Sequence, residues 1–165
     1  MNSFVRVISI AAVAVNAGCA ASDFTQPLGP DLSIVRLRAE PYSFTYSSGF
    51  DQPARLVVRD AATWQVVWNK IYLRELPVPA LPAIDFSRDM IVVAALGSRS
   101  SGGYSILLDG AAEGPDGIAI AVNSISPGPG CGVSTAFTQP VDIARLPLRQ
   151  GAVSFVERSH VSDCQ

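Results

Sequence analysis

The most continuous hydrophobic pattern in the chain lies near its middle. All seven residues of Met90–Leu96 are apolar. A run without polar alternation predicts a strand that is buried on both faces. A small polar loop follows, which contains Gly97, Gly102 and Gly103, and a second apolar segment begins at Tyr104. We therefore expect two core strands that are joined across a glycine-containing loop.

Other parts of the pattern predict further strands. Tyr42–Tyr46 alternates aromatic and hydroxyl side chains, which is typical of a half-buried strand. The acidic segment Asp109–Gly117 is predicted to be a solvated hairpin turn. The remaining strand-like segments are 32–39, 55–59, 118–125, 134–138, 141–146 and 152–156.

One segment has the pattern of an amphipathic helix, at about 60–73. Trp64 and Trp68 share one face with Val67 and Ile71, at the spacing of successive helical turns. Asp60 is a suitable N-cap. A tryptophan pair can also form a sugar-binding platform, but beside valine and isoleucine on one helical face these rings are expected in the core.

These elements predict an α+β fold that is rich in β-structure. We expect an antiparallel sheet or sandwich of about seven to nine short strands, with the single helix packed on one face. Three prolines within 76–82 make the segment after the helix an extended connector. A parallel nucleotide-binding sheet would need alternating helices, which the pattern does not contain.

The first residues have the features of an export signal. Arg6 precedes the short apolar stretch Val7–Val15, which is too short to span a bilayer. The sequence Ala17-Gly18-Cys19 resembles the bacterial lipoprotein cleavage box, although Asn16 stands where that box usually has an aliphatic residue. We therefore predict a signal peptide at 1–18, lipidation of Cys19, a tether at 19–30 and a single domain at 31–165.

Ordinary secretion, with cleavage near Ala20 or Ala21, is the alternative to lipidation. Either route places the protein outside the cytoplasm, in the bacterial periplasm or cell envelope. Ala20 after the lipidated cysteine favours the outer membrane in a Gram-negative host. Because the net charge is only −2, no basic field for nucleic acid is expected.

The two remaining cysteines are Cys131 and Cys164. An even pair in an exported chain predicts a disulfide bond. The alternative, a metal-binding pair, lacks the CxxC spacing or histidine cluster of a structural zinc site.

Candidate catalytic groups are few, so we predict that the protein is not an enzyme and uses no cofactor or metal. The loop 97–103 begins like a phosphate-binding loop, but the required Lys-Ser/Thr is replaced by Gly103-Tyr104. The single histidine, His160, is expected on the surface. Asp85 and Asp89 form a possible carboxylate pair, but Asp85 is expected to turn the chain into a strand.

Several motifs, in this order, resemble the PrcB C-terminal domain of bacterial protease-complex lipoproteins. They are Trp64…Trp68, Pro82–Phe86, Met90–Val93, Gly97, Gly102–Ile106, Pro127–Pro129 and Gln139–Val141. The resemblance extends from about Asp60 to Phe155, and Ser101 stands where the family often has threonine. It implies an exported protein or lipoprotein, and the family name implies a non-catalytic partner of a surface protease.

We therefore expect a non-catalytic lipoprotein module that is anchored in the membrane by its lipid and binds another envelope protein, such as a protease. The candidate interaction loop is Arg99, Ser100, Ser101, Gly102, Gly103 and Tyr104. The glycines are expected to serve backbone geometry and Tyr104 to pack on the sheet.

Two other functions remain open. A protease inhibitor is one, because the loop is similar to the Thr-Thr-Gly-Tyr loop of chagasin-type inhibitors, although Ser98-Arg99 replaces the Asn-Pro that precedes it there. A hydrolase is the other, with His160 as its only obvious base.

Overall fold

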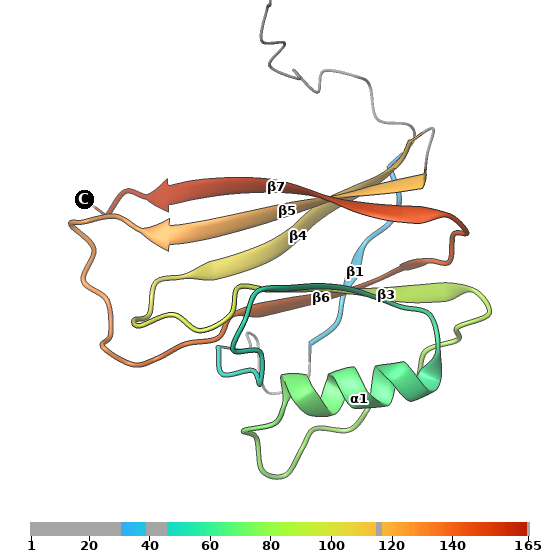
Figure 1. Ribbon diagram of the computed structural model, residues 1–165, viewed down its shortest axis with the longest axis horizontal. Helices are drawn as coiled ribbons and strands as arrows, with labels where there is room; N and C mark the ends of the chain where they lie inside the picture. Colours follow the sequence, from blue (N-terminus) through green and yellow to red (C-terminus); the bar gives the residue numbers. More distant parts are fainter. Residues whose placement is uncertain (1–30, 39–45, 115–116, 165) are drawn as a thin grey trace, which may run out of the picture.

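Two sheets and one helix stack in three layers (Figure 1). The computed structural model describes residues 31–38, 46–114 and 117–164. The middle layer is a four-stranded sheet in the order β1-β6-β3-β2, and the outer sheet has the order β4-β5-β7. Their bounds are β1 Val35–Arg36, β2 Ala54–Val58, β3 Asp89–Ala95, β4 Ser105–Gly114, β5 Gly117–Pro127, β6 Val141–Pro147 and β7 Ala152–Ser162. The fold is thus β-rich α+β with mostly antiparallel strands, as predicted.

Strand β3 lies at the centre of the middle sheet and is buried on both faces. It pairs antiparallel with β2 on one side and with β6 on the other. Ile91, Val93 and Ala95 belong to the core cluster on the helix side. Met90, Val92 and Ala94 belong to the cluster between the two sheets. The prediction from the continuous apolar run is confirmed, because successive strand side chains point to opposite faces and both faces are covered.

Helix α1, Ala61–Ile71, covers the open face of the middle sheet. Asp60 caps it, as predicted, by accepting a hydrogen bond from the Thr63 backbone N–H at 2.8 Å. That bond, the largest cause, lowers the pKa of the Asp60 carboxyl below its ordinary value.

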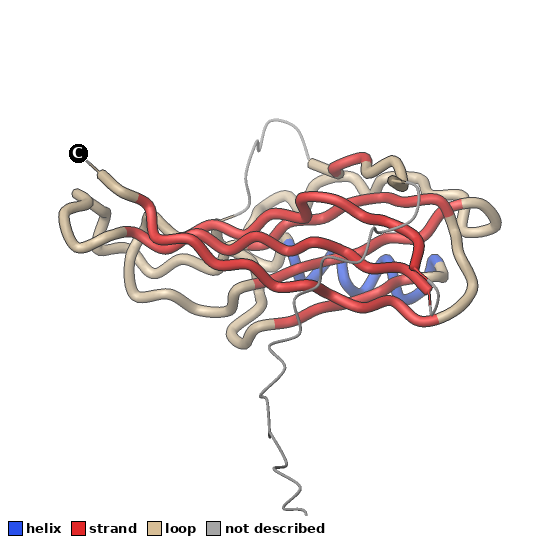
Figure 2. The backbone as a smooth tube through the Cα atoms, turned by 90° about the horizontal axis from the view of Figure 1, so that it is seen from above, coloured by secondary structure: helices blue, strands red, loops and turns tan. Residues whose placement is uncertain are grey.

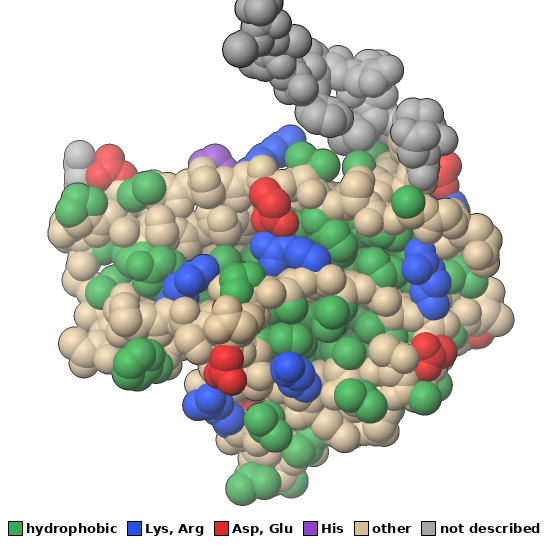
Figure 3. Space-filling model, in the orientation of Figure 1, with side chains coloured by type: hydrophobic (Ala, Val, Ile, Leu, Met, Phe, Trp, Pro, Cys, Tyr) green, Lys and Arg blue, Asp and Glu red, His purple; other side chains and the backbone are tan. Residues whose placement is uncertain are grey.

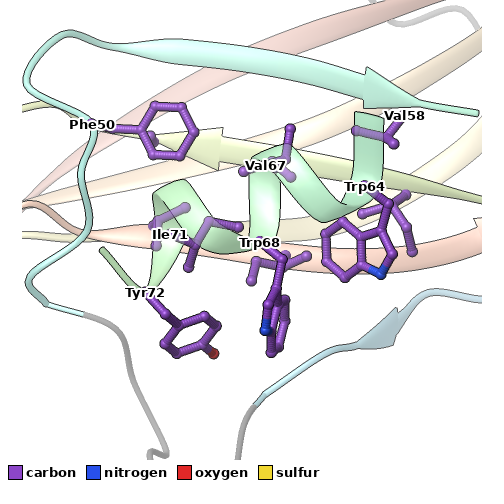
Figure 4. Close-up of a cluster of buried hydrophobic side chains, with 12 residues drawn as sticks. Phe50, Val58, Trp64, Val67, Trp68, Ile71 and Tyr72 are labelled. Atoms are coloured by element: carbon purple, nitrogen blue, oxygen red, sulfur yellow. The ribbon is translucent and has the colours of Figure 1, made fainter. Parts of the chain in front are cut away.

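Trp64 and Trp68 of α1 form a row with Tyr72, which caps the C-terminal end of the helix (Figure 4). The ring centroids of Trp64 and Trp68 lie 5.1 Å apart, and those of Trp68 and Tyr72 lie 4.4 Å apart. The two indole N–H groups donate to the carbonyls of Pro82 and Pro79 in the connector. The proline-rich connector is therefore fixed to the helix, and the tryptophans are core residues as expected.

The outer sheet differs from the prediction in the length of its strands. Asp109–Glu113 lies within β4 instead of forming a turn, and the register shifts between Leu108 and Gly110. Such a bulge frees backbone groups. The buried carboxylate of Asp142 accepts from the Leu108 N–H at 2.8 Å, and Arg36 donates both to Asp142 and to the Leu108 carbonyl. Non-local partners thus keep an acidic segment in a strand.

Strand β7 pairs parallel with β5 and continues to Ser162, so it is longer than the predicted segment 152–156 and departs from the antiparallel pairing expected of the sheet. Other corrections concern shorter segments. The segment predicted as a strand at 32–39 contains only the two-residue β1, and 134–138 is a loop with a single bridge at Thr138. The predicted signal peptide, the predicted lipidation site Cys19 and most of Tyr42–Tyr46 lie outside the described residues.

A disulfide joins Cys131, in the loop after β5, to Cys164, just beyond β7. It confirms the predicted pairing and indicates a compartment outside the cytoplasm.

No helix within the described ranges is long and apolar enough to cross a membrane.

The first prediction concerns the helix core. Trp68 is fully buried, so Trp68→Ala should lower the free energy of unfolding by about 3–5 kcal/mol, measured by urea denaturation. Val66 is on the same helix but is 68% exposed, so Val66→Ala should change the free energy of unfolding by less than about 0.5 kcal/mol. Equal effects of the two substitutions would contradict this packing.

The second prediction concerns the disulfide. The bond links residues 33 apart, and closing such a loop in the unfolded chain is worth about 3–4 kcal/mol. The double variant Cys131→Ser/Cys164→Ser should lose about this much stability in urea. Wild-type protein under a reducing agent should show the same loss, whereas the reduced double variant should lose nothing further.

Candidate functional site

Two loops lie side by side at the end of the molecule where the described chain ends (Figure 1). We call residues 97–104 and 131–139 together the loop surface. Arg99 and Thr138 exchange two backbone hydrogen bonds, at 2.8 and 3.0 Å. The Thr138 hydroxyl donates to the Ser101 carbonyl, and the Gly102 N–H donates to the Ser134 carbonyl. The predicted interaction loop is therefore held in one conformation by a segment more than thirty residues away.

Gln139 connects this surface to the segment that precedes β2. Its side chain is buried, and its amide nitrogen donates to the Asp51 carboxylate at 2.6 Å and to the Ser98 hydroxyl at 3.1 Å. Its carbonyl accepts from the buried Ser48 hydroxyl, and its N–H donates to the Tyr46 carbonyl. One glutamine thus joins its own segment to two other parts of the chain, the segment before β2 and the loop at Ser98.

Two glycines in the loop have left-handed backbone conformations, with φ of +78° at Gly97 and +84° at Gly103. A Cβ at Gly103 would lie 2.7 Å from the Val133 side chain and 3.0 Å from Pro127. Gly102 is different, because its φ is not positive and an added Cβ would meet mainly the Ser134 hydroxyl. Backbone geometry therefore explains Gly97 and Gly103.

Beside these glycines the surface is hollowed. The hollow has a volume of about 470 Å³, and its lining residues are Tyr46, Gly102, Gly103, Tyr104, Ser105, Ser134 and Thr138. Tyr104 packs partly on the core, as predicted, and the Arg99 guanidinium lies 5.6 Å from its ring centroid. The Phe137 side chain nearby is 79% exposed. Apolar and hydroxyl groups therefore share a surface whose backbone is fixed.

Comparison with known protein families matches residues 90–147 to the family model described as PrcB C-terminal. This segment is a PrcB C-terminal domain. The match includes β3 from Met90 onward, both loops of the loop surface, β4, β5 and β6. It is shorter than the resemblance in the sequence, because Trp64, Trp68 and Pro82–Phe86 lie outside it. No curated protein and no solved structure matches this chain.

The other candidate residues lie away from the loop surface of the PrcB C-terminal domain. His160 is exposed on β7, as expected of a surface histidine. Asp85 accepts from the Ser87 hydroxyl and N–H, which lowers the pKa of its carboxyl, and Asp89 pairs with Arg145 at 3.7 Å. Each carboxylate therefore has a structural partner. Within the described ranges, no three His, Cys, Asp or Glu side chains gather as a metal site.

Sequence reasoning missed two residues of this surface. The sequence assigns Gln139 only to a family motif and Phe137 only to a predicted strand. A signal for Phe137 existed, because a lone aromatic residue among small and polar neighbours is unusual in a loop. No sequence signal links Gln139 to Asp51 and Ser98, because these contacts depend on the tertiary fold.

The third prediction tests the role of Gly103. Gly103→Val should destabilise the fold by at least about 1–3 kcal/mol, because it combines positive φ with a steric clash. Ser100 is exposed in the same loop, so Ser100→Val is the matched control and should have almost no effect in thermal unfolding. Tolerance of both substitutions would remove the structural explanation of this glycine.

Proposed function

We propose that this protein is a non-catalytic exported module that binds another envelope protein through its loop surface. The observation that carries the proposal is Phe137, whose ring is 79% exposed on a segment anchored at both ends. Cys131 anchors one end through the disulfide, and Thr138 and Gln139 anchor the other through hydrogen bonds.

An exposed ring on a fixed backbone suits protein recognition for two reasons. Aromatic residues are frequent among the side chains that dominate binding energy, because they bury a large apolar area. A segment that is already ordered also loses less conformational entropy on binding. Val133, which also belongs to the loop surface, is 38% exposed, and Tyr46, which lines the hollow, is 48% exposed.

The PrcB C-terminal match and the disulfide support the finer parts of the proposal. The family name suggests a protease complex as the assembly in which the partner occurs. We further propose that Cys19 carries the lipid that holds the module at the membrane, so that the loop surface meets an envelope protein and not a cytoplasmic one.

The fourth prediction tests the loop surface directly. A photo-cross-linking amino acid at position 137, introduced into the native host, should give a discrete adduct with an envelope protein. The same amino acid at Val66, which is 68% exposed on α1, is the matched control and should give none. Phe137→Asp should weaken capture of that protein by at least about tenfold. The substitution removes the aromatic ring that the partner would bury, and it places a carboxylate that the partner would desolvate.

Two results would contradict this function. Equal cross-linking from positions 137 and 66 would show that the contact is not specific. Inhibition of a papain-like protease by the purified protein, abolished by changes at Ser100, would instead favour the inhibitor alternative.

A further inference from the structure

Strand β7 forms an open edge of the outer sheet. In the part of the chain that the structure describes, it pairs only with β5. Six consecutive residues, Val156–Val161, are all exposed. This sheet continues toward the C-terminal end beyond the helix (Figures 1 and 2). This edge strand of eleven residues contains no proline, so no residue in it lacks the backbone N–H that strand pairing needs.

The backbone of β7 offers free hydrogen-bonding groups at alternate residues. The carbonyls of Arg158 and His160 accept from hydroxyls of β5, and the Ser162 carbonyl accepts from the Gly128 N–H. These even-numbered residues therefore direct their backbone groups toward β5. Because neighbouring residues of a strand point their N–H and C=O groups in opposite directions, Glu157, Ser159 and Val161 direct theirs to the open edge.

The side chains divide between the two faces in the same way. Val153 and Phe155 pack on the core between the sheets, and Glu157 pairs with Arg55 of the middle sheet. Odd-numbered side chains thus point inward, and Arg158 and His160 point outward. Neither has an ion-pair partner among the described residues. Figure 3 shows histidine and basic side chains together on the upper surface of the molecule. The outer face of the edge is therefore basic.

A second copy of the chain does not complement this edge. In an antiparallel pair about a two-fold axis, opposite residues lie on the same face of the sheet. The outward residues of β7 are Ala152, Ser154, Val156, Arg158, His160 and Ser162, and none is acidic. Another β7 therefore brings no carboxylate to Arg158 in any such register.

We propose that the β7 edge from Val156 to Val161 binds an extended segment of a partner protein that carries acidic side chains at alternate positions. The segment joins the sheet as a fourth strand and bonds to the backbone of Glu157, Ser159 and Val161. Its carboxylates lie opposite Arg158 and His160. This inference goes beyond the proposed function, because it does not involve the loop surface.

The test uses the full disulfide-bonded chain and two synthetic probes, an eight-residue peptide of alternating glutamate and valine and the same peptide with lysine for glutamate. Amide chemical shifts should change mainly in β7 with the glutamate peptide and much less with the lysine peptide. Ser159→Pro removes an edge N–H without removing a bond to β5, so it should weaken binding by about tenfold or more. Ser159→Ala keeps this N–H and should bind like wild type.

Arg158→Glu provides a second measurement that does not depend on a proline. It should reverse the preference, so that the lysine peptide binds more tightly than the glutamate peptide. Phe137→Asp should leave peptide binding unchanged, which separates this inference from the proposed function. Equal binding of both peptides to wild type, no effect of Ser159→Pro or Arg158→Glu, or a dimer that Ser159→Pro dissociates would each overturn the proposal.

Discussion

The burial of β3 on both faces is the constraint on which the rest of the structure depends. Its alternate side chains fill two different cores, so the strand needs a cover on each side. The helix supplies one cover and the outer sheet supplies the other. Removing either layer would expose a row of apolar side chains on one side of a strand that has no polar face. The three layers are therefore mutually required, and helix α1 is as necessary as either sheet.

This constraint also accounts for the contact between the two loops of the loop surface. The loop 97–104 leaves β3 in the middle sheet and enters β4 in the outer sheet, so it must cross between layers. The segment 131–139 makes the reverse crossing, from β5 to β6. Two crossings at one end of the sandwich bring their backbones together, and the hydrogen bonds between Arg99 and Thr138 join them. Ordered loops at this end are thus a consequence of the layer topology.

The parts of the fold that sequence could predict are those set by local pattern. The apolar run of β3, the face of α1 and the Asp60 cap each depend on neighbours within a few residues. The errors have non-local causes. The segment at Asp109 forms a strand because Asp142 and Arg36 bind the Leu108 backbone at the bulge, and β7 is long because β5 provides a parallel partner along its whole length. The Gln139 contacts cannot be inferred from one sequence for the same reason.

The disulfide couples the two surfaces that we propose for binding. Cys131 begins the second segment of the loop surface, and Cys164 follows the exposed end of β7. Between these positions, the Gly128 N–H bonds to the Ser162 carbonyl and continues the contact of β5 with β7. One covalent bond therefore limits the separation of Phe137's segment from the strand edge. Since such bonds persist in oxidising compartments, the geometry of both surfaces is best maintained where the protein is exported.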